Sequence, residues 1–187
     1  MRRLLLSFFM LMGMSSIVWA DLPVYTLVKE KCSLKFIAIQ NGAPVEGKFT
    51  DFNADIHFDP DLLDKSSISA EVSTGSVTTA NEDVEKNVKL PDWLSTEAFP
   101  RAIFKTKKIS RMPQSDNYYA DGVLTLRGKT QPVVLNFSLK TFGKTQIAEG
   151  YVTLRRNEFN IGQGEWSRDD VIKNEVRVEF RIVAETK

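Results

Sequence analysis

The sequence predicts an all-β protein, an antiparallel closed β-barrel of about eight strands with one short helix near residues 80–90. Apolar and polar residues alternate with a period of two in many segments, which is typical of strands with one buried face. Short turns join most of these segments, and their regular up-and-down spacing favours a sheet that closes on itself and so protects its edges. A sandwich of two sheets is the alternative architecture.

Residues 1–20 have the pattern of a cleaved signal peptide. Two arginines come before an apolar run at 4–14, and residues 18–20 resemble a cleavage site. A retained membrane anchor is the alternative, but the run is near the lower limit for crossing a bilayer and contains serine and glycine. Asp21, and not a cysteine, stands directly after the cleavage point, so a lipoprotein is not indicated. We expect one barrel domain over residues 21–187, secreted through the signal peptide into the periplasm.

The composition excludes several classes of protein. The 25 basic and 24 acidic residues leave a formal net charge of +1, whereas nucleic-acid binding would need a concentrated basic face. The single cysteine, Cys32, rules out an internal disulfide framework, so packing must supply the stability. We expect Cys32 to be a small, half-buried strand residue and not a reactive thiol.

The first half of the chain predicts several strands. Residues 24–28 and 33–39 are separated by a charged triplet, and an Asn-Gly-Ala-Pro turn follows at 41–44. Alternation resumes at 45–58, but its phase slips by one residue after Thr50-Asp51. Such a slip predicts a β-bulge or a bend within one long strand.

The middle of the chain contains the one helical signal. A strand at 68–72 is followed by Thr79 and Glu82 at the spacing of a capping box. Apolar residues then recur at helical spacing, and Pro91 ends the pattern because a residue before proline avoids the helical region. We therefore expect a helix of about ten residues, followed by an aromatic-rich irregular segment at 92–100.

The second half predicts strands at 101–107 and 147–156, a hairpin at 118–140 and a last strand at 175–184. The hairpin turn is expected at 128–132, because glycine tolerates positive φ and Pro132 cannot serve a central ladder. A polar loop containing glycine and tryptophan is expected at 160–170.

Residues suited to catalysis are scarce. His57 is the only histidine and is expected on the surface, which leaves little material for a histidine triad or a zinc site. Acidic pairs at 59–61 and 169–170 fall in turns, and the Gly-Gln-Gly run at 162–164 lacks the context of a phosphate-binding loop. We expect a protein that is not an enzyme and needs neither a metal nor a cofactor.

Bulky apolar residues share the inward phase of the predicted strands. They could simply fill the barrel, but small residues on the same phase, such as Ala102, Ala148 and Gly150, remove volume. Trp93 and Phe99 lie beside the helix, where a lid or barrel mouth is expected, although Trp93 could equally plug it. The candidate ligand-binding residues are Phe36, Phe49, Phe52, Ile56, Phe58, Trp93, Phe99, Phe104, Leu124, Phe137, Val152 and Phe180.

Several sequence blocks resemble the YceI-like proteins, in the same order along the chain. They are GKFTDF at 47–52, DWL at 92–94, FPRAIF at 99–104, GVLTLRG at 122–128 and RNEF at 156–159. The resemblance extends from about residue 25 to residue 184. It implies a lipocalin-like barrel that binds a long polyisoprenoid, such as the tail of a quinone or of a prenyl phosphate, and a periplasmic or secreted location. It also implies a possible link to a membrane b-type cytochrome.

The chain departs from the family pattern in places. Before the tryptophan block the family often has an Arg-Asp-x-His-Leu helix, whereas this chain has Val-Glu-Lys-Asn-Val at 84–88, so no head-group role transfers from that histidine or arginine. Asn160 replaces a usual glycine and still tolerates left-handed backbone. Arg156 matches the family's arginine, and we expect it to pair with Glu158 and not with a ligand head group.

These observations predict a periplasmic carrier or scavenger that holds a polyisoprenoid lipid in a barrel cavity. One alternative is a quinone-binding accessory to a membrane b-type cytochrome. Another is a ligand-free barrel that acts through protein contacts or in stress protection. Apolar Ile37 and Ile39 on the second face of their strand hint at a homodimer.

Overall fold

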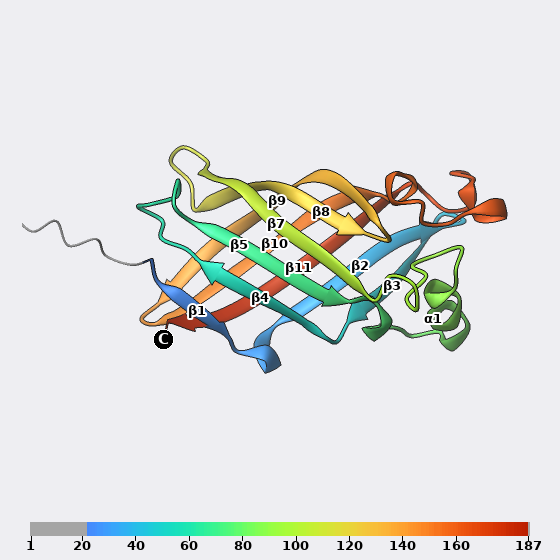
Figure 1. The fold of residues 1–187 in the computed structure, drawn as a ribbon, viewed down its shortest axis with the longest axis horizontal. Coiled ribbons are helices and arrows are strands. Elements are labelled where there is room, and N and C mark those ends of the chain that lie inside the picture. The colour runs from blue at the N-terminus through green and yellow to red at the C-terminus, as the bar shows by residue number, and fades with distance from the viewer. Residues whose placement is uncertain (1–21, 187) are drawn as a thin grey trace, which may run out of the picture.

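The computed structural model describes residues 22–186, so the predicted signal peptide lies outside the described residues. The described strands form one antiparallel sheet, and β1 pairs with both β4 and β11, which closes the sheet into a barrel (Figure 1). The strands are β1 Val24–Leu27, β2 Ser33–Gln40, β3 Ala43–Phe49, β4 Phe52–His57, β5 Ser67–Ser73, β6 Val77–Thr79, β7 Arg101–Arg111, β8 Asn117–Leu126, β9 Lys129–Phe142, β10 Thr145–Arg155 and β11 Glu175–Thr186. The helices are α1 Glu82–Lys89 and the short 3-10 helices η1 Lys29–Lys31, η2 Thr74–Ser76, η3 Arg156–Phe159 and η4 Gly164–Ser167.

The labelled strands correspond to eight barrel strands, because three long strands are each split in two. β1 and β2 are separated by η1, β3 and β4 by a bend, and β5 and β6 by η2. The two halves of a split strand keep the same neighbouring strands. β1 pairs with β4 and β2 pairs with β3, which are the two halves of the next strand, and β1 and β2 both pair with β11. The predicted closed barrel is confirmed, and the two-sheet alternative is wrong.

The predicted phase change at Thr50-Asp51 is confirmed as the bend between β3 and β4. The bend is held by η2, because Thr50 Oγ1 donates to the Ser76 carbonyl over 3.2 Å and the Asp51 amide donates to Ser76 Oγ over 3.1 Å. The bend lets the same long strand pair with β2 and β6 at one end and with β1 and β5 at the other.

The turn of the β8–β9 hairpin differs from the prediction. Arg127 and Gly128 alone form it, with φ values of 48° and 70°, as in a two-residue hairpin turn. Pro132 lies within β9, opposite Val123 of β8. The strand tolerates proline here because the pairing of β9 with β10 begins only at Asn136, so this part of β9 has one sheet neighbour.

The predicted helix near residues 80–90 is confirmed as α1, but the capping residue is different. Asn81, and not Thr79, is the N-cap, because its side chain accepts hydrogen bonds from the amides of Asp83 and Val84 over 2.9 and 3.2 Å. The Thr79 hydroxyl instead donates to the Asn81 carbonyl over 2.7 Å. The helix ends at Lys89, before Pro91, as expected.

Aromatic packing fills the barrel end that contains β1 and the C-terminus of β11, and we call this buried cluster the floor of the barrel. The Tyr118 ring stacks on Phe137 at a centroid distance of 5.4 Å and meets the edge of Phe58 at 5.6 Å. Tyr25 and Ile109 belong to the same buried cluster. Figure 1 shows α1 and the loop after β10 at the opposite end. No helix within residues 22–186 combines the length and the apolar character needed to cross a membrane.

Candidate functional site

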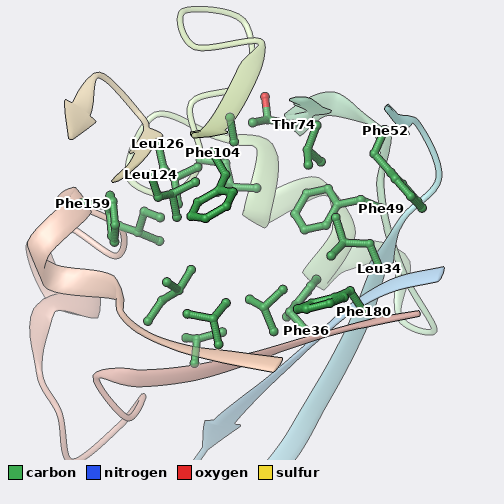
Figure 2. A pocket seen from close by; sticks show the side chains of 18 of the residues that line it. Leu34, Phe36, Phe49, Phe52, Thr74, Phe104, Leu124, Leu126, Phe159 and Phe180 are labelled. Carbon is green, nitrogen blue, oxygen red and sulfur yellow. The ribbon is translucent and has the colours of Figure 1, made fainter. Parts of the chain in front are cut away.

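A cavity of about 360 Å³ lies inside the barrel, between the aromatic floor and the end that carries α1. Its wall comes from inward positions of β2, β3, β4, β5 and β7 to β11. Figure 2 shows Phe36, Phe49 and Phe104 directed toward one shared space, with Leu124 and Phe159 along another side. Phe104 and Phe137 belong to both the floor and the cavity wall. The cavity is therefore closed at one end by packed aromatic rings.

Most of the predicted ligand-binding residues line this cavity, although their contact with a ligand stays a prediction. Those that line it are Phe36, Phe49, Phe52, Ile56, Trp93, Phe104, Leu124, Phe137, Val152 and Phe180. Phe58 does not, because it directly follows β4 and lies in the floor cluster, where 3% of it is exposed. Phe99 does not either, since its ring packs against Gly128 in the β8–β9 turn and its carbonyl accepts from Thr74 Oγ1 over 2.7 Å.

The small inward residues have two different roles. Ala102 and Ala148 line the cavity, in line with the prediction that small residues leave room. The glycines do not leave empty space, because an aromatic ring of a neighbouring strand occupies the position that a Cβ would take. These pairs are Gly47 with Phe36, Gly122 with Phe104 and Gly150 with Phe180. The glycines thus let rings lie against the barrel wall, and the cavity remains in front of them.

The cavity mouth is formed by α1 and two loops that are distant in the sequence. Helix α1 lines it with Val84, Asn87 and Val88. Trp93 of one loop and Trp166 of the other both line the cavity, with ring centroids 5.9 Å apart. The sequence singled out Trp93 but not Trp166, because the pattern gave no sign that the two loops meet.

Backbone hydrogen bonds join the two loops. The amides of Gly162 and Gln163 donate to the Asp92 carbonyl over 2.8 and 2.9 Å. The Arg127 guanidinium, from the β8–β9 turn, donates to the carbonyls of Pro91 and Asn160. The loops therefore form one continuous rim beside α1.

Arg156 lines the cavity as a buried cation, with 2% of its surface exposed. Its guanidinium donates only to backbone carbonyls, namely those of Ile161, Gly162, Arg168, Ile172 and Lys173. Burial lowers the pKa of Arg156, and the charge of Asp169 partly offsets this.

The expected pairing of Arg156 with Glu158 is wrong. The chain turns into η3 at this residue, and the side chain of Arg156 is buried whereas Glu158 is exposed. The predicted left-handed conformation of Asn160 is confirmed by its φ of 57°. Arg156 thus fixes the segment 161–173 around itself, and this structural role was not visible in the sequence.

The described residues present little that resembles a catalytic or metal site. Within residues 22–186, no group of three or more His, Cys, Asp or Glu side chains is arranged to hold a metal ion. His57 lies on the outside, with Nε2 at 3.3 Å from Asp55 Oδ1. Half-buried Cys32 lies between η1 and β2, where its thiol donates to the Val28 carbonyl over 3.3 Å.

Comparison with known proteins identifies relatives of the chain and of its fold. The sequence model of the YceI-like domain matches residues 25–184. The UPF0312 protein plu2095 of Photorhabdus laumondii is 30% identical over 98 residues, which are 52% of this chain and 50% of that relative, so the chain spans about half of its length.

Two solved structures share the barrel. BcnA of Burkholderia cenocepacia superposes with a TM-score of 0.81 at 26% identity, over 84% of this chain and 99% of BcnA. A polyisoprenoid binding domain from Saccharophagus degradans superposes with a TM-score of 0.68, over 88% of this chain and 99% of that domain. At 13% identity, the second likeness shows the fold alone.

Proposed function

Since the chain belongs to the YceI-like family, we propose that it is a lipid-binding protein that sequesters or carries a long polyisoprenoid in its barrel cavity. It would act in the periplasm and catalyse no reaction of its own. The observation that carries the proposal is the apolar cavity, which is closed by an aromatic floor and rimmed by α1 and the two tryptophan loops.

The size and lining of the cavity fit such a ligand. Its volume of about 360 Å³ lies within the range of small-molecule sites, and nearly all of its lining side chains are aliphatic or aromatic. Burial of a prenyl chain contributes about 0.8 kcal/mol per methylene-sized group, before the cost of ordering the chain is subtracted. A tail directed at the floor would leave its head group at the mouth.

Native mass spectrometry tests the proposal. The protein is purified from its own host without detergent, its mass is measured under native conditions, and bound lipid is extracted and identified. A polyprenyl species at one copy per protein is the expected result. A ligand-free mass that persists after incubation with a polyprenyl quinone and with a prenyl phosphate would contradict the proposal.

A further inference from the structure

We infer that this site selects lipids by their head group, accepting polyprenyl chains that end in an uncharged alcohol or carbonyl and rejecting those that end in phosphate or diphosphate. The inference rests on the proposed function, because it assumes that the cavity holds a prenyl tail. Three features of the cavity and its mouth argue against a phosphate, and the neutral polar groups of the mouth argue for an uncharged head group.

The first feature is that the cavity wall has no cation free to neutralise a phosphate. Arg156 is the one charged side chain that lines the cavity within residues 22–186. Both of its terminal nitrogens and its Nε already donate to backbone carbonyls, among them Ile172 at 2.7 Å and Ile161 at 3.0 Å. A phosphate inside would have to displace these carbonyls, which hold the segment 161–173. An unpaired charge in an apolar cavity is strongly unfavourable.

The second feature is the uncharged face that α1 turns to the cavity. Val84, Asn87 and Val88 line the cavity, whereas the lysines of the helix are engaged elsewhere. Lys89 Nζ lies 2.9 Å from Glu85 Oε1, and this hydrogen bond is the main cause of the lowered pKa of Glu85. Lys86 lies 3.8 Å from a carboxylate oxygen of Glu82. The helix therefore offers the cavity no positive charge.

The third feature is negative charge next to the residues of the mouth. Asp83, Asp92 and Glu165 are exposed, and each directly precedes a lining residue in the sequence. None of them forms an ion pair with a residue of the described chain. The rim cation Arg127 donates to the carbonyls of Pro91 and Asn160, and Arg168 pairs with Asp170. These carboxylates therefore add negative charge to the segments that carry Val84, Trp93 and Trp166, which disfavours a phosphate at the mouth.

The mouth does offer neutral hydrogen-bonding groups. The amide side chains of Gln40 and Asn87 line the cavity and make no hydrogen bond to any residue between 22 and 186. The indoles of Trp93 and Trp166 also line it. An amide both donates and accepts, and an indole N–H donates, so these groups suit a hydroxyl or carbonyl head group.

The test compares two ligands that share one tail. The purified protein is loaded with the apolar fluorophore N-phenyl-1-naphthylamine, which is then displaced by geranylgeraniol or by geranylgeranyl diphosphate. We expect the diphosphate to bind at least tenfold more weakly, with the difference shrinking as salt screens the rim carboxylates. Equal or tighter binding of the diphosphate would overturn the inference while leaving the proposed function intact. If neither ligand nor the fluorophore binds, both fail.

A positive charge introduced at the mouth should weaken the preference for the uncharged head group. Val84→Arg and, independently, Asn87→Lys place a cation on the cavity face of α1, and each should lower the ratio of diphosphate to alcohol dissociation constants at least threefold. Val134→Arg is the matched control, because Val134 is exposed on β9 and does not line the cavity. This substitution adds the same charge as the two mouth variants. Should both mouth variants keep the wild-type ratio, the mouth charge does not select the ligand and the inference is wrong.

Discussion

At the scale of single residues, the glycines that face inward act through the aromatic rings beside them. A Cβ on Gly150 would lie 2.7 Å from the Phe180 ring and 2.6 Å from Phe137 Cβ. Gly150 is the direct cross-strand partner of both phenylalanines, one on β11 and one on β9. The glycine therefore lets two large side chains meet across β10 at the boundary between floor and cavity.

Replacement of this glycine should destabilise the protein. In Gly150→Ala the new Cβ would lie 2.1 Å from the Asn136 carbonyl oxygen, so backbone as well as side chains must shift. We expect the free energy of unfolding to fall by about 1–3 kcal/mol, measured by urea denaturation. Gly75→Ala is the control, because no atom lies within 4 Å of its Cβ position and its stability should change by less than about 0.5 kcal/mol. Equal effects of the two substitutions would contradict this account.

The sequence could indicate such glycines only in part. Small residues on the inward phase predicted empty volume, and this holds for Ala102 and Ala148, which line the cavity. It fails for Gly150, because the identity of a cross-strand neighbour depends on the register, and alternation alone does not fix the register. The sequence predicts Phe58 in the cavity wall for the same reason, because alternation shows that a residue faces inward but not how far along the barrel it lies.

At the scale of elements, α1 is a part of the mouth whose backbone makes no hydrogen bond to the backbone of a barrel strand within residues 22–186. None of its residues is fully buried, and its N-terminus is held by the Asn81 cap and by the bond from the Thr79 amide to Glu85 Oε2, at 3.3 Å. The two tryptophan loops, in contrast, are joined by backbone bonds to Asp92 and by the donors of Arg127. Local opening should therefore begin at the helix.

Removal of the cap should loosen α1 without unfolding the barrel. In Asn81→Ala the amides of Asp83 and Val84 lose their acceptor, at a cost of about 0.5–2 kcal/mol to the helix. We expect faster hydrogen exchange of the α1 amides, unchanged exchange in β8 and β9, and an unchanged midpoint of thermal unfolding. Glu82→Ala on the exposed face of the same helix should leave α1 exchange near the wild-type rate. A lower unfolding midpoint for Asn81→Ala would show that α1 belongs to the cooperative core.

At the scale of the whole molecule, the barrel was predictable because its neighbours in space are mostly neighbours in sequence. Alternating strands joined by short turns predict both the order and the antiparallel sense. The mouth was less predictable, since its two loops meet through backbone carbonyls such as that of Asp92 and through the carbonyls around Arg156. Every residue has a backbone carbonyl, so a contact made through carbonyls does not depend on residue type. The sequence therefore contains no side-chain pattern that predicts the contact of Trp93 with Trp166.

The cavity itself can be tested by filling it. Ala102 lines the cavity from β7, and Ala102→Phe would place a ring in the space that we propose for the prenyl tail. We expect at least tenfold weaker binding of geranylgeraniol, measured by displacement of N-phenyl-1-naphthylamine, with thermal stability unchanged or raised because apolar contacts are gained. Thr153→Phe is the control, since Thr153 is exposed on β10 between the inward-facing Val152 and Leu154. If a folded Ala102→Phe protein binds the lipid as well as the wild type does, the ligand lies outside the barrel cavity.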